Sequence, residues 1–139
     1  MSQEKIILIT GGGSGIGFAA AEMLASQANI VYAASRTPER TSIDTALSKN
    51  LFAVKLDVNN EENIHALVNS IVAKHGRLDV LVCNAGNGVA GAVEDCSSED
   101  VKYQFETNFF GLVKCVNACL AQFRQQKSGK IITISSVAA

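Results

Sequence analysis

The chain has 139 residues, of which 47% are apolar and 18% charged, so it can bury a core and does not have the composition of a disordered tail. This length suits one domain, and we expect residues 1–139 to form it. Twelve lysines and arginines stand against thirteen aspartates and glutamates, a net charge of -1 with neither sign gathered into a run, which argues against nucleic acid or a membrane surface as a partner.

The apolar runs and the cysteines indicate a cytoplasmic protein. The apolar runs at 6–9 and 80–83 are far too short to span a membrane. Within residues 1–10, the apolar run before the glycine-rich loop is also too short for a signal peptide. The cysteines are spaced for neither a zinc site nor a redox CxxC pair, so we expect no metal and reduced thiols. Cys115 and Cys119 lie in an apolar helical stretch, and we interpret them as core residues.

The chain begins with an unbroken apolar run over 5–10, which predicts a strand that is covered on both faces. A helix is expected over 16–27, followed by a second strand over 29–35. Pro38 then stands near the start of a polar helix that we expect to end at about Lys49. The core face of the first helix is expected to hold Ile16, Ala20, Met23 and Leu24.

A third strand is expected over 51–58, and Asn60 is expected to cap a helix that ends at Gly76. Residues 78–86 form the fourth strand and its loop, and Ser97 or Ser98 opens a long helix. The fifth strand covers 130–136. The apolar stripe of the long helix is expected to be Val101, Phe105, Phe109, Leu112, Val116 and Leu120.

Strands and helices alternate along the whole chain with brief connections. This pattern predicts an α/β protein with a doubly wound parallel sheet, here given as far as its fifth strand. Such sheets bind their ligands at the carboxyl ends of the strands. Candidate functional residues are therefore those that directly follow each strand.

The first strand runs into a glycine-rich loop, TGGGSGIG at positions 10–17, which leads directly into a helix. Glycines let the backbone approach a pyrophosphate, whose charge is met by free amides at the helix N-terminus. The GxGxxG and Walker patterns do not match, whereas TGxxxGxG does, with Thr10, Gly11, Gly15 and Gly17 in register. A close-packed turn without a ligand is the alternative interpretation.

This loop resembles that of the short-chain dehydrogenase/reductase family. The resemblance covers the whole given chain, which is about the N-terminal half of an ordinary family member. It implies a Rossmann-type fold and hydride transfer between a nicotinamide cofactor and a carbonyl/alcohol pair. The residues that we take for the cofactor site are Gly11, Ser14, Gly15, Ile16, Gly17, Ser35, Arg36, Asp57, Val58, Asn84, Ala85 and Gly86.

The end of the second strand favours NADP(H) over NAD(H). An NAD site usually has a carboxylate about 20 residues past the loop, on the ribose 2′-hydroxyl, but here Ser35 stands in that place and Arg36 follows. A guanidinium can bind a 2′-phosphate through charge-assisted hydrogen bonds. Ser14 occupies a position where many NADP-preferring relatives carry a second basic residue. The alternative for Arg36 is an ordinary solvated charge.

Two further segments resemble cofactor contacts of the family. Asp57 and Val58 are similar to its adenine-contacting pair, although Asp57 is also suited to turning the chain toward the next helix. Residues 83–86 (CNAG) are similar to the family's NNAG motif, with Cys83 in place of the first asparagine.

The resemblance also implies two catalytic residues in this chain. Asn108 matches the asparagine that holds a proton-relay water, and Ser136 matches the serine that orients the substrate oxygen. A serine pair that ends a strand is equally typical of a turn. The family's YxxxK pair has no counterpart here, because Tyr32 is followed four residues later by Arg36, and Tyr103 by Thr107.

We therefore expect the given sequence to be the cofactor-binding half of an oxidoreductase and to be inactive by itself. The expected partner is a small-molecule carbonyl or alcohol, and the full-length protein is expected to be a homo-oligomer. The alternatives are a non-catalytic nucleotide-binding or interaction module and a defective truncated product. In the chain as given, the apolar strand at 131–134 would form an exposed edge of the sheet, which the interaction module is expected to cover with a partner strand or a second copy.

Overall fold

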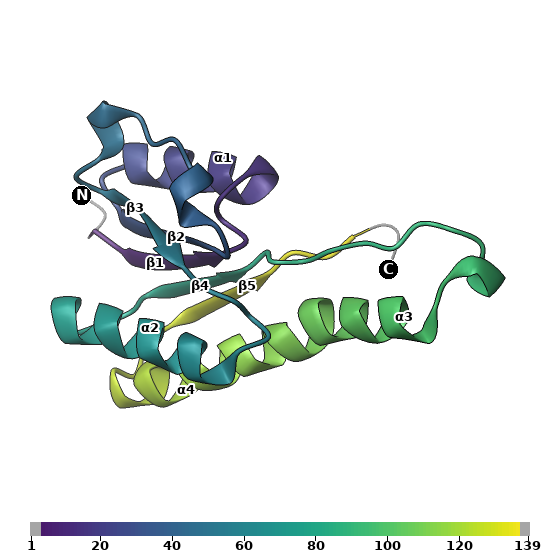
Figure 1. Ribbon diagram of the computed structural model, residues 1–139. Coiled ribbons are helices and arrows are strands. Elements are labelled where there is room, and N and C mark those ends of the chain that lie inside the picture. The colour runs from purple at the N-terminus through teal and green to yellow at the C-terminus, as the bar shows by residue number, and fades with distance from the viewer. Residues whose placement is uncertain (1–3, 137–139) are drawn as a thin grey trace.

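The computed structural model describes residues 4–136 and shows a five-stranded parallel sheet (Figure 1). The order β3-β2-β1-β4-β5 reverses direction at β1, and this confirms the doubly wound fold that the sequence predicts. The carboxyl ends of β1 and β4 flank the point of reversal, where open α/β sheets form their ligand crevice. The strands are β1 (Ile6–Thr10), β2 (Ile30–Ser35), β3 (Leu51–Lys55), β4 (Val80–Cys83) and β5 (Lys130–Thr133).

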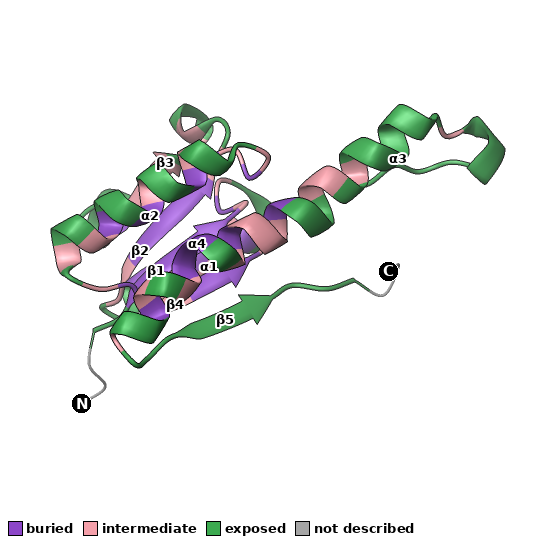
Figure 2. Cartoon of the chain, turned by 90° about the horizontal axis from the view of Figure 1, so that it is seen from below, coloured by how far each residue is buried: buried purple, intermediate pink, exposed green. Residues whose placement is uncertain are grey.

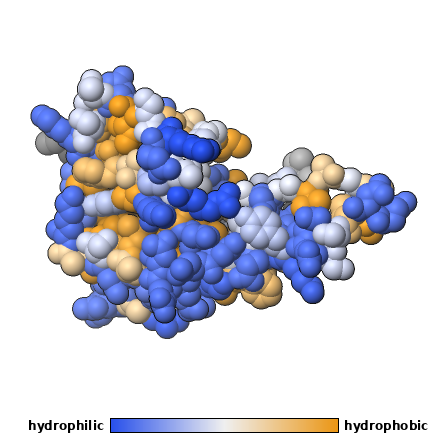
Figure 3. Space-filling view, viewed as in Figure 1, coloured by the Kyte–Doolittle hydropathy of each residue, from blue (hydrophilic) through white to orange (hydrophobic). Residues whose placement is uncertain are grey.

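Helices cover both faces of this sheet. Helix α1 lies on one face, whereas α2 and α4 lie on the other, and α3 projects beyond the sheet (Figure 1). Figure 3 shows this projecting segment standing away from the body of the molecule, with polar and apolar side chains intermingled. No helix within residues 4–136 combines the length and the apolar character needed to cross a membrane. The helices are α1 (Gly15–Ser26), α2 (Glu61–His75), α3 (Ser98–Phe105) and α4 (Gly111–Gln125).

The central strand β1 joins the two halves of the core. All five of its residues are buried, and successive side chains point to opposite faces. Leu8 packs into the cluster under α2 and α4, whereas Ile9 packs into the cluster under α1. Complete burial of one such side chain contributes about 1.5–3 kcal/mol, so β1 stabilises both layers of the fold.

Helix α2 begins and ends as the sequence predicts. The side chain of Asn60 accepts a hydrogen bond from the backbone N–H of Asn63, which satisfies one free amide of the first turn. Gly76 has a φ of 72° and its N–H donates to the carbonyl oxygen of Val72, which closes the last turn.

The predicted core face of α1 is wrong. Ile16 is 76% exposed and Met23 56% exposed, and Ala20 and Leu24 are only partly buried. Small side chains allow a helix backbone to approach a sheet closely. The face of α1 with the smallest side chains is therefore the one that packs against the sheet. The fully buried residues of α1 are Gly17, Ala21 and Ala25.

The helix predicted between Pro38 and Lys49 is also wrong. The segment contains only two short 3₁₀ turns, Pro38–Arg40 and Thr45–Leu47. The Thr41 hydroxyl donates to the carbonyl oxygen of Gly13 at 3.2 Å, and the Asp44 carboxylate accepts from the N–H of Ala46. Such side-chain bonds compete with helical ones, and here they fasten the segment beside the glycine loop.

The long helix is interrupted by a π turn over Glu106–Phe110, which joins α3 to α4. The extra residue in this turn rotates the side chains of α3 relative to those of α4. Together with the projection of α3, this explains why three residues of the predicted stripe, Val101, Phe105 and Phe109, are exposed. Leu112, Val116 and Leu120 are only partly buried. The buried face of α4 consists of Gly111, Cys115, Ala118, Cys119 and Phe123.

Three cysteines are part of the core, as predicted for two of them. Burial raises the pKa of Cys83 to about 11 and the pKa of Cys115 and of Cys119 to about 12. These thiols stay protonated at neutral pH and are therefore poor nucleophiles.

At the outer edge of the sheet, Ile131 and Ile132 of β5 are 36% and 41% exposed (Figure 2).

His75 on α2, which contacts the buried Tyr32, makes the stability of the fold depend on pH. The Tyr32 hydroxyl lies 2.8 Å from Nε2 of His75, and the Phe52 ring stacks on Tyr32. Burial, followed by the charge of Lys74, lowers the pKa of His75 below its ordinary value of 6.5. The unfolded chain therefore binds a proton that the folded chain does not, and folding stability falls as the pH drops through that value.

We expect the free energy of unfolding in urea to fall modestly between about pH 7.5 and about pH 5.5. His75→Gln is expected to reduce this fall, whereas the matched variant His65→Gln, on the exposed side of α2, is expected to preserve it. An identical pH profile for the wild type and His75→Gln would contradict the assignment.

Candidate functional site

A pocket of about 660 Å³ lies at the carboxyl ends of β1 to β4. It is lined by the glycine loop and by the segments that follow β2, β3 and β4, together with Tyr103 and Thr107 from the α3 side. The structure thus brings together eleven of the twelve residues that we assigned to the cofactor. They are Gly11, Ser14, Ile16, Gly17, Ser35, Arg36, Asp57, Val58, Asn84, Ala85 and Gly86.

Gly15 is the exception, because it does not line the pocket. It has a φ of 55° and no heavy atom lies within 4 Å of the position where a Cβ would stand. This left-handed backbone conformation favours glycine. Gly15 therefore shapes the start of α1 instead of facing a ligand.

Hydrogen bonds lock the glycine loop onto the end of β4. The Thr10 hydroxyl oxygen accepts from the N–H groups of Asn84 and Ala85, both at 3.1 Å. The Asn84 amide donates to the carbonyl oxygen of Gly11 at 3.0 Å. A Cβ on Gly17 would overlap both Gly11 O and Asn84 Nδ2, so only glycine allows the start of α1 to lie this close to the loop.

The segment that follows β2 carries two arginines that line the pocket, Arg36 and Arg40. Within residues 4–136, neither guanidinium forms an ion pair with a carboxylate. Nη1 of Arg36 donates to the Tyr103 hydroxyl at 2.9 Å. The Ser35 hydroxyl is buried and has no hydrogen-bond partner in the part of the chain that the structure describes. This end of the pocket therefore offers positive charge and a free hydroxyl.

Asp57 turns the chain, as one of its two interpretations predicts, and it stands at the wall of the pocket. One carboxylate oxygen accepts from the backbone N–H of Asn59 at 3.0 Å, which turns the chain toward α2, and the residue also lines the pocket. The Asn59 amide in turn donates to the Thr107 hydroxyl at 3.2 Å. This bond connects the end of β3 to the π turn.

The two candidate catalytic residues lie outside the large pocket. Asn108 stands in the π turn, where its Oδ1 accepts from the N–H of Asn87 and its Nδ2 donates to the Asn87 carbonyl, both at 2.8 Å. It also lines a smaller pocket of about 140 Å³ with Gln104, Phe105 and Phe109. Ser136 follows β5, is exposed and lines neither of these pockets.

Sequence reasoning missed seven residues that line the large pocket. For Tyr103 and Thr107 a signal was available, because residues four apart share one side of a helix and Thr107 directly precedes Asn108. For Asn87, whose Oδ1 is buried without a partner among the described residues, the available signal was its place directly after Gly86 in the segment that follows β4. The seven are Gly13, Thr37, Arg40, Leu56, Asn87, Tyr103 and Thr107.

Comparisons with known proteins cover nearly the whole chain. The family model described as short chain dehydrogenase matches residues 5–139. The 3-ketodihydrosphingosine reductase of Bacteroides thetaiotaomicron is 43% identical over 138 residues, which are 97% of this chain and 48% of that protein. The chain spans about half the length of the curated relatives it matches.

Solved structures give the same result. A short-chain dehydrogenase from Streptomyces avermitilis matches with a TM-score of 0.90 and 34% identity, over 96% of this chain and 50% of that chain. The structure titled ElxO with NADP bound matches with a TM-score of 0.89 and 33% identity, over 97% of this chain and 56% of that chain.

Proposed function

Since the chain belongs to the short-chain dehydrogenase family, we propose that it is the cofactor-binding part of an NADP(H)-dependent oxidoreductase that interconverts a carbonyl and an alcohol by hydride transfer. Residues 1–139 then belong to one dinucleotide-binding domain. The observation that carries the proposal is the pair Arg36 and Arg40 in the pocket, where an NAD site would place a carboxylate.

The shape of the pocket supports a dinucleotide. The glycine loop gives a phosphate access to the amides at the start of α1, and a Cβ at Gly17 would close this cradle. Of the three buried side-chain oxygens that lack a hydrogen-bond partner within residues 4–136, two belong to residues that line the pocket, Ser35 Oγ and Asn87 Oδ1, and the third is Asn59 Oδ1. Leaving such atoms unpaired is costly, so a polar ligand that bonds to them would be stabilised. Bound NADPH would supply the hydride.

The positive end of the pocket supports NADP(H) over NAD(H). Arg36 and Arg40 can donate several hydrogen bonds to a 2′-phosphate, and no carboxylate within residues 4–136 competes for them by an ion pair. A ribose 2′-hydroxyl would instead need an acceptor such as a carboxylate. The related structure of ElxO carries NADP.

For the chemistry, we assign Ser136 to orienting the substrate oxygen and Asn108 to the relay of a proton. Both side-chain groups of Asn108 are bonded to the backbone of Asn87, so Asn108 also holds residues 84–87 beside the cofactor. A π turn at such a residue supports this assignment, because π turns are frequent at functional sites.

The substrate is proposed only as a class, a small-molecule carbonyl or alcohol, in line with the keto group in the name of the Bacteroides relative. We also propose a homo-oligomer for the full-length protein, supported by the exposed Phe105, Phe109 and Phe110. A cytoplasmic location is supported by the free cysteines.

Carbonyl-dependent loss of NADPH absorbance by the full-length protein tests the activity, and no turnover on a broad carbonyl panel would contradict it.

The cofactor preference can be tested by calorimetric titration of the protein with NADPH and NADH. Arg36→Ala is expected to weaken NADPH binding about tenfold and to change NADH binding less than about twofold, because only NADPH offers a 2′-phosphate. The expected loss of NADPH affinity is limited to about tenfold because Arg40 remains to bind the 2′-phosphate.

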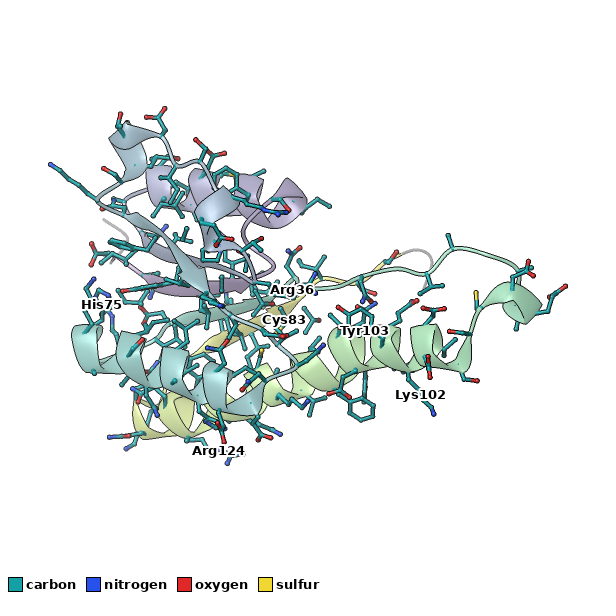
Figure 4. All side chains as sticks on the ribbon, in the orientation of Figure 1. Arg36, His75, Cys83, Lys102, Tyr103 and Arg124 are labelled. Carbon is teal, nitrogen blue, oxygen red and sulfur yellow. The ribbon has the colours of Figure 1, made fainter. Side chains whose placement is uncertain are left out.

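The matched control is Arg124→Ala, which removes an arginine from α4 that lies away from the pocket (Figure 4). It is expected to leave both affinities unchanged. Equal losses for NADPH and NADH in Arg36→Ala would contradict the proposed preference.

A further inference from the structure

A contact across the pocket joins two segments that lie far apart in the sequence. Tyr103 on α3 is 67 residues away from Arg36, yet its hydroxyl oxygen accepts a hydrogen bond from Arg36 Nη1 at 2.9 Å. Figure 4 shows the two side chains on the same side of the molecule, between the end of β2 and α3. Both residues line the large pocket.

The hydrogen-bonding capacity of this pair is nearly all donor. The Arg36 guanidinium has five N–H groups, one of which is used by Tyr103. The Tyr103 hydroxyl accepts that bond, and within residues 4–136 its own proton has no acceptor. A ligand that satisfies both groups must be an anion with several acceptor oxygens, and a phosphate monoester meets this requirement.

Hydrogen bonds near Tyr103 also fix its position beside the pocket. Thr107, one helical turn further on, is tied to the end of β3 by the bond from Asn59. Lys114 bonds to the Glu106 carboxylate and to the carbonyl oxygen of Asn59, which adds a second tie to the same loop. Because α3 has no buried residue of its own, these ties and the Arg36 contact fix where Tyr103 lies.

We propose that Tyr103 is a further specificity residue for the cofactor: its hydroxyl orients the Arg36 guanidinium and donates a hydrogen bond to the 2′-phosphate of NADP(H). This inference rests on the proposed function and adds to it a residue from α3, on the side of the pocket opposite β2. NAD(H) lacks the phosphate and gains nothing from this hydroxyl.

The test is Tyr103→Phe, which removes only the hydroxyl, with binding measured by calorimetry. NADPH binding is expected to weaken about fivefold, the range of one hydrogen bond, and NADH binding to stay within about twofold. The isolated probes 2′-AMP and 5′-AMP should show the same contrast, with only 2′-AMP weakened. The thermal unfolding midpoint of Tyr103→Phe is expected to match that of the wild type.

The control is Lys102→Ala, which removes a positive charge from the neighbouring residue that does not line the pocket. It is expected to change neither affinity. A wild-type protein that prefers NADPH while Tyr103→Phe keeps the same preference would overturn this inference alone. A wild-type protein that binds neither nucleotide would overturn the proposed function, and this inference with it.

Discussion

Gly17→Ala is expected to weaken NADPH binding by at least about 100-fold and to lower the free energy of unfolding by about 1–3 kcal/mol. The added Cβ would overlap the carbonyl oxygen of Gly11 and the side-chain nitrogen of Asn84. Neither group can move freely, because the two are hydrogen-bonded to each other at 3.0 Å. The start of α1 must therefore shift, and with it the amides that we propose to face the pyrophosphate.

Two measurements check this expectation: calorimetric titration with NADPH and unfolding in urea. Gly88→Ala is the matched control, because no heavy atom lies within 4 Å of its added Cβ and its φ is not left-handed. It is expected to keep nearly wild-type affinity and stability. Wild-type affinity in Gly17→Ala would mean that the loop has more room than the structure shows.

Thr10→Val should destabilise the protein by about 2–4 kcal/mol while keeping the volume of the side chain. Thr10 is 2% exposed, and its hydroxyl oxygen accepts from the N–H groups of Asn84 and Ala85. Valine has no acceptor, so both amides lose their partner, at a cost of about 1–2 kcal/mol each, in the lower part of the usual range because Asn84 and Ala85 are only partly buried. The segment that follows β4 would lose these two bonds to the end of β1, while the backbone pairing of the two strands would remain.

Unfolding in urea gives the size of this effect. Thr10→Ser retains the hydroxyl and loses only a methyl group, so it is expected to cost about 1 kcal/mol. Comparing the two variants separates the hydrogen bonds from the packing. If Thr10→Val were as stable as Thr10→Ser, the hydroxyl would not be holding the two strand ends together.

The parts of this structure that follow from local chemistry could be predicted from the sequence. Unbroken runs of Ile, Leu and Val gave the positions of the buried strands, and Asn60 and Gly76 gave both ends of α2. The pocket could be placed because the carboxyl ends of parallel strands share one edge of the sheet. Asp57 and Asn84, which follow different strands, line it together for this reason.

The parts that depend on packing between distant segments could not be predicted in this way. The buried face of α1 follows from how closely Gly17 approaches the loop, not from the bulk of Ile16 and Met23. The π turn rotates the side chains of α3 relative to those of α4. The predicted apolar stripe assumed one continuous helix without such a rotation. Tyr103 reaches Arg36 only because α3 lies along the pocket, which no spacing within one helix reveals.

The way the pocket is assembled has a consequence for the newly synthesised chain. Its lining starts at Gly11 and ends at Thr107, and β1 becomes central only when β4 pairs with it. A ribosome must therefore translate more than 100 codons before a nucleotide can find a complete binding surface. During that interval the half-built sheet has an open edge at β1, and exposed edges of this kind favour aggregation and engagement by chaperones.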